Sequence, residues 1–115
     1  MTLGPKVPKV RSEPYRRYIA SLPCYRCGIH GYSQAAHADY DKGMGIKTDD
    51  LTCYPLCGPS FGNMEGCHHF VGRTMAREER RAYEIAGAAW AKDALIRQSQ
   101  EDRKLRELLL KLGVL

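Results

Sequence analysis

The sequence lacks a long run of apolar residues. The longest one extends from Ile85 to Ala91, whereas about 20 apolar residues are needed to cross a bilayer. Residues 1–14 also lack the apolar core of a signal peptide. We therefore expect a cytoplasmic protein that makes no membrane contact.

The chain has five cysteines, so they cannot all form disulfide pairs with one another. A secreted disulfide framework normally uses pairs, and the spacing Cys24-x-x-Cys27 suits zinc better. A thioredoxin-type strand and helix do not flank this pair, which disfavours a redox motif. These features indicate a metal-binding protein of a reducing compartment.

At 115 residues the chain is long enough for one domain with a modest core. Domains of this size often need an additional constraint, and a bound metal is one solution. The formal net charge is +5, with an isoelectric point near 9.0. This charge favours a polyanionic partner and says nothing about the fold.

Composition divides the chain into three parts. Residues 1–11 are rich in proline and basic side chains, which predicts an extended arm that either lies on phosphates or is simply solvated. Residues 12–95 hold every cysteine and histidine and form the predicted domain. Residues 96–115 are predicted to form a C-terminal amphipathic helix.

Helix signals occur at both ends of the predicted domain. Ser12 and Pro14 mark the start of a short helix that ends before Pro23. Thr74 is the predicted cap of a second helix, which Gly87 interrupts or bends before a helical pattern continues to residue 112. Four leucines of this region share one helix face: Leu105, Leu108, Leu109 and Leu112. This face could bind a protein partner or a second copy of the chain, or it could pack on the domain.

Two short strands are predicted between these helices, from Gln34 to Tyr40 and from Leu51 to Leu56. Pro55 confines the second strand to a sheet edge or shortens it. Helices flanking a small hairpin make the chain an α+β protein.

Four cysteines are the predicted ligands of a structural zinc ion: Cys24, Cys27, Cys57 and Cys67. Cys53 is the odd cysteine and could replace Cys57, but the Pro-Leu-Cys context favours Cys57. A second alternative exchanges Cys67 for His68 in the zinc set.

His37 and His68 are the predicted centre of phosphodiester hydrolysis. An imidazole titrates near neutral pH, so His37 suits a general base that deprotonates an attacking water. A neutral ring nitrogen of His68 can hold a divalent metal. The alternative interpretation of His37 is a buried, hydrogen-bonded histidine. If His37 is the general base, the carbonyl of a neighbouring residue is expected to orient its second ring nitrogen.

The motifs CYRC, AHADY, GMGIKTDDL, PLC and CHH follow one another in this order. As a set they resemble the HNH endonucleases of the ββα-metal type, and more closely the small phage and prophage HNH proteins related to the RecA-dependent nuclease of a temperate phage. The resemblance covers roughly residues 11–95. It implies a zinc-stapled ββα-metal hairpin-and-helix core with flanking helices.

The resemblance also implies roles for individual residues. His37 matches the general base, Asp50 the middle position of the HNH pattern, and His68 the metal-binding histidine of the final helix. The implied activity is cleavage of double-stranded DNA with Mg²⁺ or Mn²⁺, by a phage- or prophage-encoded protein in a bacterial host. Basic side chains are the predicted DNA contacts: Arg16, Arg17, Lys47, Arg73 and Arg77.

The sequence departs from the family at two positions that often supply a metal ligand. Gly72 stands four residues after His68, and Ala36 directly precedes the base. The second ligand must come from elsewhere, and the candidates are Asp39, Asp50 and His69. Because of these departures, a DNA-binding module that has lost catalysis is the alternative function.

Overall fold

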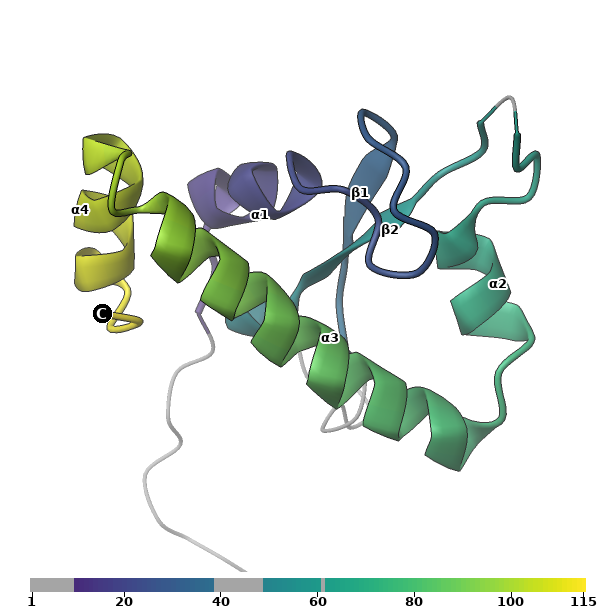
Figure 1. The fold of residues 1–115 in the computed structure, drawn as a ribbon. Coiled ribbons are helices and arrows are strands. Elements are labelled where there is room, and N and C mark those ends of the chain that lie inside the picture. The colour runs from purple at the N-terminus through teal and green to yellow at the C-terminus, as the bar shows by residue number, and fades with distance from the viewer. Residues whose placement is uncertain (1–9, 39–48, 61) are drawn as a thin grey trace, which may run out of the picture.

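The computed structural model describes residues 10–38, 49–60 and 62–115. In these ranges the protein is a small α+β structure, with one two-stranded antiparallel sheet and four α-helices (Figure 1). The predicted α+β class is confirmed at this level. Most of the predicted basic arm lies outside the described residues, and so do Asp39 and Lys47.

Helix α1 (Glu13–Ala20) begins where the sequence predicts. The Tyr15 amide donates to Ser12 Oγ at 3.2 Å, which satisfies one of the free N–H groups of the first turn. Tyr15 and Ile19 point inward and are fully buried. The helix therefore covers part of the core with the face that its apolar spacing indicated.

The sheet pairs β1 (Ser33–Ala36) with β2 (Tyr54–Cys57), and Ser33 lies opposite Cys57 in the register. The predicted start of the second strand at Leu51 is wrong. Leu51 lies in a single 3₁₀ turn, η1 (Asp50–Thr52), because its amide donates to the Asp49 carboxylate at 2.8 Å.

Helices α2 (Cys67–Arg73) and α3 (Arg77–Gln98) follow β2, and α3 passes across the sheet (Figure 1). Thr74 directly follows α2 and does not cap α3. The predicted interruption at Gly87 is also wrong, since α3 runs through it. A Cβ at position 87 would lie 2.7 Å from the Tyr54 ring, so glycine allows close helix–sheet packing here.

Aromatic contacts fix α3 against the rest of the domain. The Tyr25 ring lies 5.1 Å from that of Tyr83 and 5.2 Å from that of Trp90, measured between centroids. Tyr25 also meets Tyr54 of β2 edge to face at 6.0 Å. These contacts join α3 to the loop that carries the first cysteine pair.

The helical region breaks between the end of α3 at Gln98 and the start of α4 (Arg103–Lys111), not at Gly87. Asp102 caps α4 by accepting the Leu105 amide at 3.0 Å. Leu105 and Leu109 are fully buried, which favours the packing interpretation for this part of the leucine stripe. None of the helices in the described ranges is long and apolar enough to cross a membrane.

Candidate metal centre and histidine cleft

Four cysteine side chains converge at one point. The Sγ atoms of Cys24, Cys27, Cys57 and Cys67 all lie within 4.8 Å of one another. The Cys27 and Cys57 sulfurs are 3.7 Å apart, close to the separation of about 3.8 Å expected for two thiolates on a tetrahedral zinc ion. The cluster could hold a structural metal such as zinc, and it contains the four predicted ligands.

Local backbone geometry brings these cysteines together. Cys57 ends β2 and Cys67 begins α2. Just before Cys67, Gly66 packs against the backbone of Cys57 and Gly58. Gly66 has a φ of 82°, and a Cβ there would lie 2.8 Å from the carbonyl carbon of Gly58. Only glycine fits this close approach, so it sets where Cys67 lies.

Polar groups surround the sulfurs. The Cys27 and Cys57 amides donate to Cys24 Sγ at 3.5 and 3.4 Å. Burial opposes ionisation of Cys24, but these hydrogen bonds outweigh it and lower the pKa of Cys24 to about 7. Burial raises the pKa of Cys67 to about 12. Four thiolates this close together would repel one another, so they can all be ionised only if a cation is bound between them.

A basic side chain covers one side of the cluster. The Arg26 guanidinium donates to Cys67 Sγ at 3.5 Å and stacks over the Phe70 ring at 3.8 Å from its centroid. A zinc ion with four thiolates carries a net negative charge, which this guanidinium offsets.

Cys53 lies apart from the cluster, beside His37 and Asp50. Its thiol is fully buried, and burial raises the pKa of Cys53 to about 12. Between the two predicted alternatives, the structure therefore places Cys57 with the other three cysteines. His68 does not belong to that group either.

Asp50 orients His37. Its Oδ1 lies 2.8 Å from His37 Nε2, while the imidazole stays 30% exposed and the carboxylate is fully buried. The predicted orienting group was a neighbouring carbonyl, and the structure supplies a carboxylate instead. Since an ionised carboxylate can only accept, the proton of this hydrogen bond lies on Nε2.

The buried charge of Asp50 is matched by several donors. The Ser12 amide donates to Oδ2 at 2.6 Å, the Arg16 guanidinium binds the same oxygen, and Arg11 Nη1 lies 3.9 Å from Oδ1. Burial opposes ionisation, but the hydrogen bonds from His37, Ser12 and Arg16 outweigh it and lower the pKa of Asp50. Two guanidinium groups beside this carboxylate disfavour a cation at His37, Asp50 and Cys53, although their ligand atoms lie within 4.8 Å of one another.

His68 is the second residue of α2. Its Nδ1 lies 2.8 Å from Oε1 of Gln34 on β1. An amide oxygen accepts, so the proton of this hydrogen bond lies on Nδ1. Metal-binding histidines typically have their second nitrogen held in this way. Gly58 leaves room for this contact, because a Cβ there would lie 2.6 Å from Gln34 Nε2.

His37 and His68 line the same small cleft, of about 60 Å³, although they come from different parts of the chain. The sequence predicted that these two side chains converge. The other lining residues are Ala36, Tyr54, Leu56, Val71, Gly72, Arg80 and Glu84. Glu84 and Arg80 are the polar members that sequence reasoning did not assign to the site. Neither residue belongs to one of the sequence motifs, so no local signal pointed to them.

The remaining predicted residues have other partners or stay exposed. His69 Nε2 pairs with Glu65 at 3.4 Å, and both line a neighbouring hollow of about 340 Å³ that also reaches His68. Arg17 pairs with Glu13 at 2.6 Å. Arg73 ends α2 and Arg77 begins α3, and both are exposed, so their predicted DNA contact stays a prediction.

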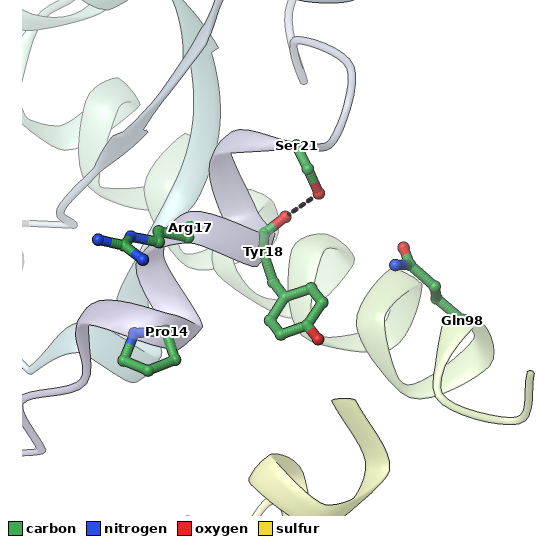
Figure 2. A pocket seen from close by; sticks show the side chains of 5 residues that line it. All are labelled: Pro14, Arg17, Tyr18, Ser21 and Gln98. Carbon is green, nitrogen blue, oxygen red and sulfur yellow. Dashed lines mark hydrogen bonds between the residues drawn. The ribbon is translucent and has the colours of Figure 1, made fainter. Parts of the chain in front are cut away.

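A larger hollow, of about 540 Å³, lies between α1 and the end of α3 (Figure 2). Figure 2 shows the Tyr18 ring beside Gln98, with Arg17 pointing to the opposite side. Neither a histidine nor a carboxylate lines this hollow among the described residues. Size alone therefore does not make it the candidate site.

Comparison of the chain with protein-family models, curated proteins and solved structures finds no match.

Proposed function

We propose that this protein is a metal-dependent DNA endonuclease of the HNH type, built on a ββα-metal core with zinc at the four cysteines. The observation that supports it best is the shared cleft of His37 and His68, in which each imidazole has one nitrogen held by a neighbouring side chain. Contacts of this kind orient an imidazole ring, as a general base and a metal ligand both require.

His37 acts as the general base in this proposal. Its Nδ1 accepts a proton from the water that attacks the phosphorus atom. Asp50 is a positioning residue, because it holds Nε2 and stabilises the imidazolium that forms. The low pKa of Asp50 keeps its carboxylate ionised throughout.

His68 would hold a divalent ion, Mg²⁺ or Mn²⁺, through Nε2, while Gln34 fixes the ring. The ion supplies positive charge to the phosphate as negative charge develops. Arg80 lines the cleft as well, and the net charge of +5 favours approach of DNA. A zinc ion bound by Cys57 and Cys67 would hold the end of β2 and the start of α2 together, and so would fix His68 against β1.

A zinc-containing DNA-binding module without catalysis is the second candidate. Ala36 and Gly72 favour it, since neither can bind a metal. Among the described residues, His68 also belongs to no group of three close metal-ligand side chains. This candidate predicts salt-sensitive DNA binding without cleavage.

Plasmid nicking in Mg²⁺ and Mn²⁺ separates the two candidates. For the nuclease, His37→Ala lowers the rate by about 10² to 10⁴, the usual contribution of a general base. His30→Ala is the matched control, because His30 is exposed and lies outside the cleft. Zinc content and circular dichroism confirm that each variant is folded.

Wild-type nicking that persists in His37→Ala contradicts the assigned mechanism. DNA binding without cleavage in either metal favours the second candidate. If the wild-type protein neither binds nor cuts DNA, both candidates are wrong.

A further inference from the structure

The four sulfurs of the cysteine cluster do not have the same surroundings. Cys27 is exposed, whereas the other three cysteines of the cluster are buried. Its sulfur lies 3.7 Å from that of Cys57. We propose that Cys27 is the reactive thiolate of the cluster, that a hydroperoxide oxidises it to a disulfide with Cys57, and that the metal is thereby released. The proposal rests on the zinc ion of the proposed function, because a bound metal keeps its thiol ligands deprotonated.

N–H groups donate to the other three sulfurs. Two backbone amides donate to Cys24 Sγ, at 3.4 and 3.5 Å. The Cys67 amide donates to Cys57 Sγ at 3.4 Å. The side chains of Arg26 and Asn63 both donate to Cys67 Sγ at 3.5 Å. Hydrogen bonds of this kind stabilise the negative charge of a thiolate, so they lower its tendency to attack an electrophile.

Cys27 Sγ differs from these sulfurs in both respects. Within residues 10–38, 49–60 and 62–115, no N–H group donates to it, and its described contact is with the Cys57 sulfur. The rate at which a cysteine is oxidised follows its thiolate character and its exposure. A small oxidant that arrives from the solvent therefore meets at Cys27 the sulfur that is most accessible and keeps most of its negative charge.

The oxidation balances with a hydroperoxide as the oxidant. The Cys27 thiolate attacks the hydroperoxide, so that a sulfur–oxygen bond forms and the O–O bond breaks, which gives a sulfenic acid and an alkoxide, or hydroxide when the oxidant is hydrogen peroxide. The Cys57 thiolate then attacks the sulfenic sulfur, the disulfide forms and hydroxide leaves. Two electrons pass from the pair of sulfurs to the hydroperoxide, and water protonates the anions that leave.

The disulfide opens the metal centre. The sulfurs of Cys27 and Cys57 already lie side by side, so the second thiolate is in place when the sulfenic acid forms. The metal then keeps only Cys24 and Cys67, whereas a structural zinc site uses four protein ligands. Release of the ion breaks the link between the end of β2 and the start of α2. Oxidation therefore reaches the cleft through the backbone that carries His68.

Zinc release from the zinc-loaded full chain in hydrogen peroxide, followed with a chromogenic zinc indicator, tests this proposal without depending on activity. Cys27→His should lose most of the peroxide-dependent release, and it keeps a complete ligand set because three cysteines and one histidine also bind structural zinc. Cys24→His has the same ligand composition but retains Cys27, so it should stay sensitive. Cys53→Ser lies outside the cluster and should release zinc as the wild type does.

A second measurement uses the wild type alone, so it does not depend on the folding of a variant. Brief treatment of the zinc-loaded protein with N-ethylmaleimide should alkylate Cys27 before the other cysteines of the cluster, as mapped by mass spectrometry. The same mapping after partial oxidation by hydrogen peroxide should find Cys27 joined to Cys57.

The outcomes separate the reactive thiolate from the proposed function. Equal zinc release from wild type and Cys27→His, or alkylation that begins at another cysteine, overturns the role of Cys27. A disulfide between Cys27 and Cys24 overturns that of Cys57. Zinc that stays bound in hydrogen peroxide overturns the proposal, and DNA nicking by the same protein leaves the nuclease standing. Peroxide-dependent release from a wild type that cuts no DNA supports the proposal and contradicts the nuclease. A wild type that binds no zinc contradicts both.

Discussion

The cysteine cluster and the histidine cleft are built on the same small sheet but differ in geometry. The cluster gathers four ligand atoms within 4.8 Å, and three of its cysteines are buried. In the cleft, His37 contacts Asp50 and His68 contacts Gln34, and both histidines line a space of about 60 Å³. Structural metal sites are typically closed by protein ligands, whereas catalytic sites keep open positions.

The two regions share part of the backbone. The cluster joins the loop that carries Cys24 and Cys27, the end of β2 and the start of α2, so it fixes the backbone from which His68 projects. In the cleft, Asp50 orients the His37 ring and Gln34 orients the His68 ring. We infer that damage to the cluster destroys both regions, while damage to the cleft leaves the cluster intact.

Zinc removal should have the largest effect. Structural zinc contributes about 10 to 16 kcal/mol in small metal-binding domains, more than most domains have in total stability. Cys67→Ser, or a strong chelator, should abolish the cooperative thermal transition seen by circular dichroism. Cys53→Ser is the control, because Cys53 lies outside the cluster, and it should keep one zinc per chain by mass spectrometry. A cooperative fold that survives without metal contradicts this prediction.

Asp50→Asn should damage the cleft region alone. It removes a fully buried charge that faces Arg16 and His37, and loss of one partner of a buried pair typically costs about 3 to 5 kcal/mol. Urea unfolding measures this change, and the zinc content should stay the same. Glu13→Gln removes an exposed partner of Arg17 and should cost less than about 1 kcal/mol. Similar losses in both variants would argue against a special role for Asp50.

Gly66→Ala tests the connection between the two regions. The substitution puts a Cβ 2.8 Å from the Gly58 carbonyl carbon at a φ of 82°. Strain and overpacking together should lower the free energy of unfolding by about 2 to 4 kcal/mol, and zinc should be released at lower chelator concentration. Gly62→Ala meets nothing within 4 Å and should be close to wild type. Equal chelator sensitivity of the two variants would contradict the prediction.

Gln34→Ala should have the smallest effect on stability, because Gln34 is exposed. The free energy of unfolding should change by no more than about 0.5 kcal/mol. Loss of the contact to His68 Nδ1 should nevertheless weaken Mn²⁺ binding about 10- to 100-fold. Calorimetry measures the affinity, and an unchanged value would show that Gln34 does not position His68.

Some features could be predicted because their cause is local. The Ser12 cap, the apolar face of α1 and the Cys-x-x-Cys turn depend on residues close together in the chain. The start of β2 and the course of α3 could not be predicted in this way. Gly87 reads as a helix breaker, but the Tyr54 ring packs against it and α3 continues. Tertiary packing here outweighs a helix propensity of about 1 kcal/mol.

The cleft was predictable only in part. The order of motifs pointed to His37, Asp50 and His68, and the structure brings the two histidines to one cleft with Asp50 on His37. Glu84 escaped sequence reasoning because it belongs to no motif and reaches the cleft only after α3 crosses the sheet. The orienting role of Gln34 likewise depends on the position of α2.

By itself, the sequence determined the chemical groups and the ion that they suit, because thiolate, imidazole and carboxylate carry their ligand preferences in any fold. The tertiary structure decided which of these groups meet. Asp50 lies against Arg16 and His37, whereas Glu84 lines the cleft with His68 and Arg80, although both are buried carboxylates. The difference arises from neighbours far apart in the chain, and only long-range packing places them.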